Sequence, residues 1–96
     1  MKFMVQWYTH PDKRMDVVQD WVGRTPEERG NLGPGLKMIG RWHNPIEGDG
    51  VLIVEADSHA DLVRYVTPWT FVMDISIAPV LDDEESAAAL KSGLGG

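Results

Sequence analysis

Four polar side chains in the sequence are of types that carry out acid–base chemistry or bind an anionic group. Arg41 and His43 stand two residues apart in one apolar segment, and Glu55 and Asp74 belong to two later segments. A histidine titrates near neutral pH and can accept or donate a proton, and an arginine binds carboxylates and oxyanions. We predict that His43 acts as the acid or base, that Arg41 holds an anionic group of a substrate, and that Glu55 orients His43.

Structural explanations compete with each of these roles. His43 stands at the end of its segment, where a hydrogen-bonded histidine serves packing alone. A buried arginine needs an anionic partner whatever the function, so Arg41 with Glu55 or Asp74 is more simply an ion pair that holds neighbouring strands in register. Both explanations stay open at the level of the sequence.

Other residues are of types that contact a ligand without reacting with it. Gln6 and Tyr8 can hydrogen-bond a ligand oxygen, Asp74 can bind a substrate group, and Trp42 can stack on a planar ring. We predict these four as substrate-binding residues. A place at the rim of an interface explains Tyr8 equally well.

The four tryptophans divide into two pairs. Trp42 and Trp69 are predicted to flank a planar ligand, whereas Trp7 and Trp21 are predicted to fill the core. For any single tryptophan, core packing is the simpler role because the side chain buries a large area.

The hydrophobic pattern predicts four strands. Residues 2–9 and 51–56 alternate between two faces and are rich in β-branched and aromatic side chains, and residues 36–43 and 71–80 are the other two strands. The segment 44–50 carries the Asn-Pro and Gly-Asp-Gly turn sequences, which predict a hairpin between the second and third strands.

Helices are predicted between the strands. Asp12 and Ser58 are expected to cap two of them. The first has an apolar stripe of Met15, Val18 and Val22, joined by Trp21, and an end at Gly23. Thr25 and Glu28 form a capping box that opens a short turn, and the acidic residues 82–85 precede a last helix at 87–91. The order is β-α-β-β-α-β plus a terminal helix, an α+β ferredoxin-like arrangement.

Two helices cover one face of such a sheet, and we call the other the open face. The uniformly apolar positions are assigned to the helix side: Phe3, Val5, Trp7, Leu52, Val54, Ala56, Met73, Ile75 and Ile77. The open face is predicted to carry Gln6, Tyr8, Arg41, His43, Glu55 and Asp74 among Met4, Ile39, Ile53 and Val72. A shift of one residue in the second strand would exchange its two faces.

A face of this mixed character suits a second sheet packed across it, with polar groups around a pocket. We therefore predict a homodimer that forms through the open face.

The Gly- and Pro-rich segment 24–35 is expected to be a mobile gate to the site.

Composition limits the classes of function. The 96 residues are predicted to form one domain, 1–96, with a flexible tail at 92–96. The net charge of −6 repels nucleic acid and anionic membranes. There is no cysteine, and the three histidines have no metal-ligand spacing, so we predict no metal and no cofactor. We expect no signal peptide and no membrane span, and a cytoplasmic location.

Four motifs in the same order resemble a known bacterial family. They are the opening Met1-Lys2-Phe3-Met4-Val5, Gly40-Arg41-Trp42-His43, Val54-Glu55-Ala56-Asp57 and the run Pro79-Val80-Leu81-Asp82-Asp83-Glu84-Glu85. The family is domain of unknown function 3303, in the dimeric α/β-barrel superfamily. The resemblance implies a ferredoxin-like protomer whose sheet pairs face to face with that of its mate. It implies no reaction and no catalytic residue, because this fold hosts many activities.

The wider superfamily that this resemblance points to includes cofactor-free monooxygenases, haem-degrading enzymes, isomerases of small lactones and stress-related binding proteins. Our leading hypothesis is a cofactor-independent enzyme or binder of a small, partly apolar or aromatic molecule, which lies in a cavity between the sheet and its neighbouring elements. The alternative is a non-catalytic dimeric module for stress response or protein interaction, without a cavity beside His43. Haem or flavin binding is a third hypothesis.

Overall fold

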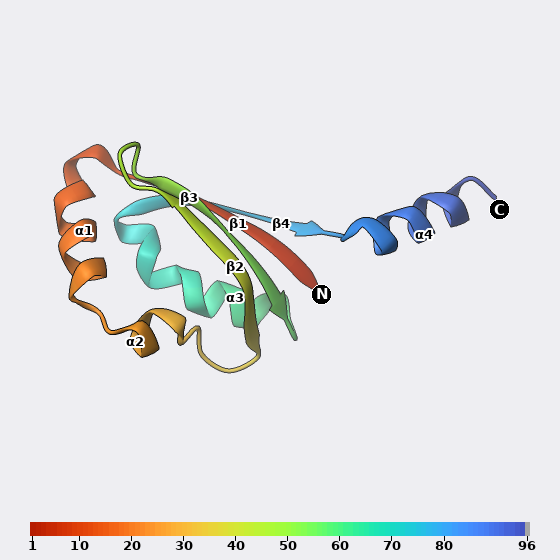
Figure 1. Cartoon of the computed structure of the whole chain (residues 1–96), viewed down its shortest axis with the longest axis horizontal. Coiled ribbons are helices and arrows are strands. Elements are labelled where there is room, and N and C mark those ends of the chain that lie inside the picture. The colour runs from red at the N-terminus through yellow and green to blue at the C-terminus, as the bar shows by residue number, and fades with distance from the viewer. Residues whose placement is uncertain (96) are drawn as a thin grey trace.

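Alternating β-branched and aromatic residues form a four-stranded antiparallel sheet in the computed structural model, which describes residues 1–95. Its strands are β1 (Lys2–Thr9), β2 (Leu36–Asn44), β3 (Asp49–Ala56) and β4 (Met73–Val80), in the order β2-β3-β1-β4. Helices α1 (Arg14–Gly23) and α3 (His59–Val66) lie on one face of this sheet (Figure 1). The predicted ferredoxin-like fold with an extra C-terminal helix is confirmed.

Capping residues fix most helix starts where the sequence predicts them. The Ser58 hydroxyl accepts a hydrogen bond from the Asp61 backbone N–H at 3.2 Å at the start of α3. Thr25 and Glu28 form the predicted capping box at α2 (Pro26–Gly30). The Asp12 cap is wrong, because Asp12 lies inside a 3₁₀ turn, η1 (Pro11–Lys13), that precedes α1.

The core lies between the sheet and α3. It contains the predicted apolar positions of β1 and β3 together with one side of the helix: Phe3, Val5, Leu52, Val54, Ala56, Leu62 and Val66. Leu32, between α2 and β2, is also buried in this core. It therefore anchors the segment 24–35, whose predicted role as a gate stays a prediction.

The face assignment of β2 was wrong, and a β-bulge is the reason. Met38 pairs with Val54 but Gly40 pairs with Ile53, so that one extra residue, Ile39, interrupts the ladder. Before the bulge the even-numbered residues share the helix side, and after it the odd-numbered ones do. Neither of the two sets that regular alternation predicts is therefore kept.

After the bulge, Arg41 pairs with Leu52 and His43 pairs with Gly50. Leu52 belongs to the buried side of β3, so both Arg41 and His43 lie on the helix side and not on the open face. The prediction for β4 needs a smaller correction. Val72 precedes β4, after a 3₁₀ turn, η2 (Thr67–Phe71), and is not a residue of the open face.

The chain ends in α4 (Asp83–Gly93), which is longer than the helix predicted at 87–91. Its N-terminal residue Asp82 forms a capping box with Glu85, which explains the earlier start. Residues 92 and 93, predicted in the flexible tail, are helical, and Gly96 lies outside the described residues. Within residues 1–95 no helix combines the length and the apolar character that a membrane span requires.

Candidate functional site

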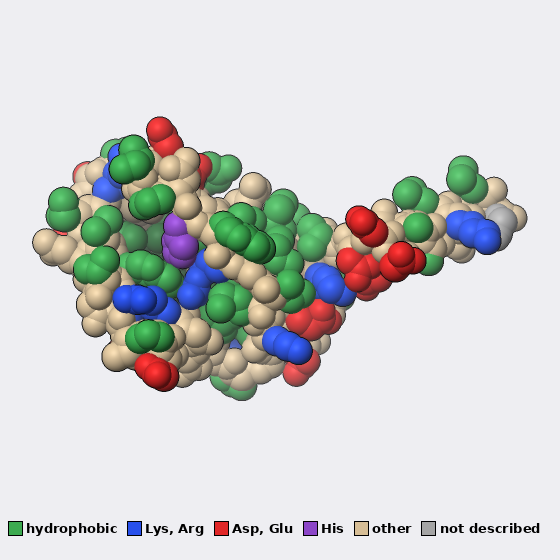
Figure 2. All heavy atoms as spheres, viewed as in Figure 1, with side chains coloured by type: hydrophobic (Ala, Val, Ile, Leu, Met, Phe, Trp, Pro, Cys, Tyr) green, Lys and Arg blue, Asp and Glu red, His purple; other side chains and the backbone are tan. Residues whose placement is uncertain are grey.

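A cavity of about 210 Å³ lies between the helix side of the sheet and the helices that cover it. Strands β1, β2, β3 and β4 supply its floor, and α1, α3 and η2 supply its walls. Its wall is largely apolar, and the side chains around it include Val5, Trp7, Val17, Trp21, Arg41, His43, Leu52, Tyr65, Trp69, Met73 and Ile75. Figure 2 shows a histidine and basic side chains among hydrophobic ones on this side of the body.

Three of the four tryptophans line this cavity. Trp7 comes from β1, Trp21 from α1 and Trp69 from η2. Trp69 was predicted to flank a ligand, and Trp7 and Trp21 were predicted to pack in the core; all three border the cavity and are only half-buried. Flat indole walls of this kind favour a planar ligand.

His43 is held between two of these indoles. Its ring centroid lies 5.3 Å from that of Trp7, edge-on at 65°, and 5.1 Å from that of Trp21, at 48°. The side chain is exposed to solvent despite these two ring contacts. The geometry fixes the ring plane at the wall of the cavity and leaves a nitrogen free to meet a ligand.

Arg41 stands next to His43 on the same side of β2. Its guanidinium carbon lies 4.6 Å from the ring centroid of Trp21, a cation–π distance, and its Nη2 donates to the backbone carbonyl of Arg29 at 2.9 Å. Its Nη1 is buried and has no hydrogen-bond partner among residues 1–95. A buried donor without an acceptor costs about 1–3 kcal/mol, which a ligand oxygen placed there would recover.

The environment of His43 lowers its pKa from the ordinary value. Burial of the ring against the indoles is the larger cause, because it penalises the charged imidazolium, and the positive charge of Arg41 is the second. His43 is therefore neutral at neutral pH. A neutral imidazole can accept a proton, so the pair combines a base with a fixed cation that stabilises the resulting anion.

Glu55 does not belong to this site. It lies five residues along β3 from Gly50, the partner of His43, which is about 17 Å along a strand. Its carboxylate accepts a hydrogen bond from the N-terminal ammonium of Met1 at 2.7 Å and lies 3.8 Å from the Nζ of Lys2. The prediction that Glu55 orients His43, or pairs with Arg41, is not supported by this placement.

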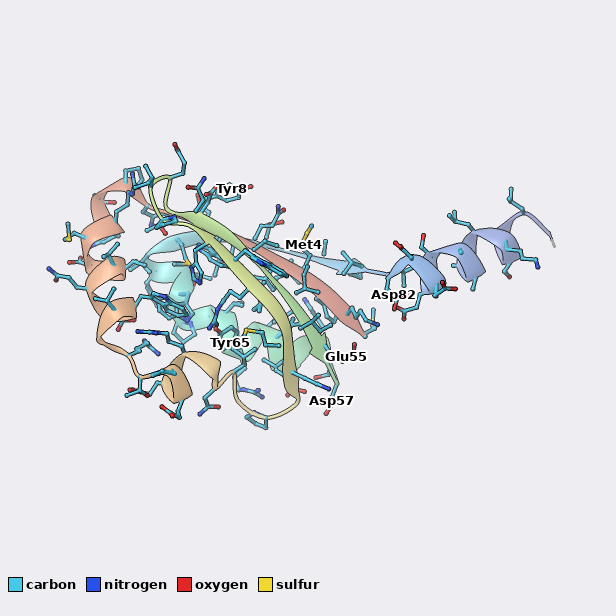
Figure 3. The ribbon with its side chains drawn as sticks, in the orientation of Figure 1. Met4, Tyr8, Glu55, Asp57, Tyr65 and Asp82 are labelled. Atoms are coloured by element: carbon cyan, nitrogen blue, oxygen red, sulfur yellow. The ribbon has the colours of Figure 1, made fainter. Side chains whose placement is uncertain are left out.

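The predicted substrate-binding residues lie on the other side of the sheet. Gln6 and Tyr8 project from β1 to the open face, as Figure 3 shows for Tyr8, and Tyr8 is 51% exposed. Asp74 lies opposite Tyr8 on β4 and pairs with the Nε2 of His10 at 3.1 Å. Trp42 also faces away from the cavity and is 60% exposed.

Helix α1 forms one wall of the cavity mainly through its predicted apolar stripe. Val18, Trp21 and Val22 line the cavity and Val17 joins them, whereas Met15 is not a lining residue and is 66% exposed. The stripe therefore indicated this wall, and Val17 is an apolar lining residue that it did not include. The signal for the bulge was Gly40, since a glycine inside a strand pattern often marks one.

The comparison with known protein families gives one match. The sequence matches the family described as "Domain of unknown function (DUF3303)" over residues 1–94. The chain therefore belongs to this family, as its motifs predicted. No curated protein matches the sequence.

Proposed function

We propose that this chain binds a small planar molecule with an anionic or strongly hydrogen-bond-accepting group, and that His43 removes a proton from it without a cofactor. The observation that carries the proposal is the cavity in which Arg41 and His43 meet three indoles. The reaction class that fits is proton abstraction from an acidic O–H or C–H group, as in isomerisation or cofactor-free oxygenation.

The size of the cavity defines the ligand. An apolar protein cavity of about 150 Å³ accommodates benzene, so the 210 Å³ here accommodates one ring with substituents or two fused rings. The indoles supply apolar contact, and the free Nη1 of Arg41 supplies a strong polar anchor for an acceptor group.

A binding experiment tests the role of Arg41. Intrinsic tryptophan fluorescence would be titrated with 2-naphthoate and with the uncharged methyl ester of the same acid. We expect Arg41→Met to weaken naphthoate binding by roughly tenfold or more and to leave the ester unaffected, because a charge-assisted hydrogen bond contributes about 1.5–3 kcal/mol.

Arg24→Met is the matched control. The guanidinium carbon of Arg24 also stacks on an indole, 5.2 Å from the Trp69 ring, but its polar partner is Asp20 at 2.8 Å. Equal naphthoate affinity in wild type, Arg41→Met and Arg24→Met would contradict the proposed site.

The acid–base half of the proposal has an optical test. 4-Nitrophenol absorbs at different wavelengths as phenol and as phenolate, and a neutral His43 beside Arg41 favours the bound phenolate. We expect the protein to shift the phenol–phenolate equilibrium toward phenolate at mildly acidic pH, and His43→Gln to reduce that shift. If 4-nitrophenol binds to the wild-type protein with an unchanged spectrum, the protein binds the ligand but the proposed proton abstraction is refuted.

The open face of the sheet supports a second proposal, the homodimer predicted from the sequence. Half-buried apolar side chains occupy the open face, among them Met4, Val51 and Ile53. The chain exposes 6536 Å², whereas a folded monomer of 10.7 kDa exposes about 5,500 Å². The excess of about 1,000 Å² is close to the roughly 800 Å² that each partner buries in a standard interface.

Dimer and cavity lie on opposite sides of the sheet, so they are separate proposals. A non-catalytic interaction module, the alternative function, would need the dimer alone. The lack of cysteine fits a reducing compartment, and we keep the cytoplasm as the proposed location.

A further inference from the structure

The last helix, α4, stands away from the rest of the chain. It continues outward from the end of β4 and forms an arm (Figure 1), which we define as residues 83–93. The contacts that tie it to the body are at its first turn, where the Nζ of Lys2 lies 2.9 Å from a Glu85 oxygen and 3.6 Å from Asp82. The radius of gyration is 15.5 Å, against about 12.5 Å for a compact chain of this length.

The arm is specified as a helix by its own sequence. Asp82 and Glu85 close a capping box, with bonds of 2.8 and 3.1 Å, and a run of alanines follows, the residue with the highest helix propensity. An isolated helix of 11 residues is nevertheless marginal in water. Such a helix needs a surface on which to pack.

One side of the arm is apolar and uncovered. Ala87, Leu90 and Leu94 recur at spacings of three and four, which places them on one face, and Leu90 and Leu94 are 65% and 89% exposed. In Figure 2 the hydrophobic side chains of the arm gather mainly along its upper edge. Met4 and Tyr8, on the open face, project toward the same edge of this view (Figure 3).

We infer that α4 is a dimerisation arm that packs on a second copy of this chain. The inference rests on the dimer proposed above and adds a second contact to it. When a twofold axis brings two open faces together, each copy contributes its open face and its arm to the interface. The excess surface of about 1,000 Å², to which the exposed arm contributes, is of the size that one such interface covers.

Amide hydrogen exchange of the full chain tests the inference directly. Exchange of residues 84–93 would be followed across a dilution series that spans the dissociation constant of the dimer, measured in parallel by sedimentation equilibrium. An arm that packs on the second copy is protected in the dimer and loses protection as the dimer dissociates, while the amides of β1 stay protected.

Leu90→Asp adds a second readout. It places a charge on the apolar side of the arm, and we expect it to weaken dimerisation by roughly tenfold or more. Ser92→Asp is the matched control, because it puts the same residue on the opposite side of the same helix and leaves the dimer unchanged. Both positions are exposed, so neither substitution disturbs the core.

Each outcome separates the arm from the dimer. A full chain that stays monomeric at every concentration refutes the proposed dimer. A stable dimer whose α4 amides exchange freely, or whose affinity is equally insensitive to Leu90→Asp and Ser92→Asp, refutes the arm alone. Protection of α4 in the monomer shows that the arm packs on its own chain and also overturns the inference.

Discussion

The chemistry of the site depends on two neighbouring side chains and the indoles around them. Burial of the His43 ring, and secondly the positive charge of Arg41, disfavour the imidazolium, so the imidazole stays neutral and available as a base. Arg41 cannot lose its own charge, and its stacking on Trp21 holds the guanidinium in one orientation. The combination keeps a base and a cation side by side, which free side chains in water would not do.

This arrangement predicts the titration of His43. By NMR, its pKa in the intact protein should lie below the ordinary value of about 6.5. Arg41→Met should raise the pKa, since it removes one positive charge, but only in part, because burial, the larger cause, stays. A pKa at or above the ordinary value in the wild type would contradict the packing of the ring between Trp7 and Trp21.

The same shift has a consequence for stability. The folded-state pKa is lowered, so the unfolded chain takes up the proton first as the pH falls. The contribution of neutral His43 to the free energy of unfolding is complete above the ordinary pKa. It is lost as the pH falls through the ordinary pKa and then through the lowered pKa of the folded state. Urea unfolding at several pH values should show a smaller loss of stability on acidification in His43→Gln than in wild type, the other histidines being common to both.

At the scale of elements, alternation predicts which segments are strands better than it predicts which way their side chains point. For β1, β3 and β4 the apolar faces are confirmed, because an unbroken alternation leaves one choice of buried side. In β2 a single extra residue at Ile39 reverses the sides from there onward. Regular alternation therefore predicts Arg41 and His43 on the open face, together with Glu55 and Asp74. In the structure Arg41 and His43 lie on the helix side, away from both carboxylates.

The sequence predicted a cavity between the sheet and its neighbouring elements, but not the residues that line it, for a related reason. The residues that line it come from seven elements, and their meeting depends on how α1 and η2 lie over the sheet. Periodicity indicated Val18, Trp21 and Val22 of α1, which line the cavity, but it did not show that Val17 lines it too or that Met15 is left exposed. Residue types identified Arg41 and His43 as candidates, but only the tertiary arrangement showed that indoles surround them.

The β2–β3 hairpin carries a prediction about close packing. A Cβ built on Gly50 would lie 2.6 Å from the backbone oxygen of Trp42 and would also meet the ring of Trp7. Gly50→Ala should therefore destabilise the fold by about 1–3 kcal/mol, measured by thermal or urea unfolding. It should also perturb the fluorescence of Trp7, which lines the cavity.

Gly23→Ala is the control for this substitution. Gly23 ends α1, and a Cβ there meets no atom within 4 Å. Replacing a helical glycine by alanine is neutral or slightly stabilising. Equal stability of Gly50→Ala and Gly23→Ala would show that the hairpin strands are less tightly packed than described.

At the scale of the whole molecule, the sheet divides two roles between its faces. The helix side holds the cavity with Arg41 and His43, and the open face holds the half-buried apolar residues that favour a partner. Glu55 and Asp74, which the sequence predicts in one shared site, lie apart: Glu55 pairs with the N-terminal ammonium, and Asp74 hydrogen-bonds the imidazole of His10. Association of two copies would therefore leave the cavity intact in each protomer.

This division predicts that assembly and ligand binding respond to different substitutions. Ile53 lies in the central strand β3 on the open face, and Ile53→Glu places a charge where the second sheet would pack, so sedimentation should show a monomer of unchanged circular dichroism. Val63→Glu, on the exposed side of α3, is the matched control and should leave the dimer intact. Naphthoate affinity should be the same in both variants, because the cavity belongs to a single chain. Loss of naphthoate binding in the Ile53→Glu monomer, with its fold retained, would show instead that the second copy helps to build the site.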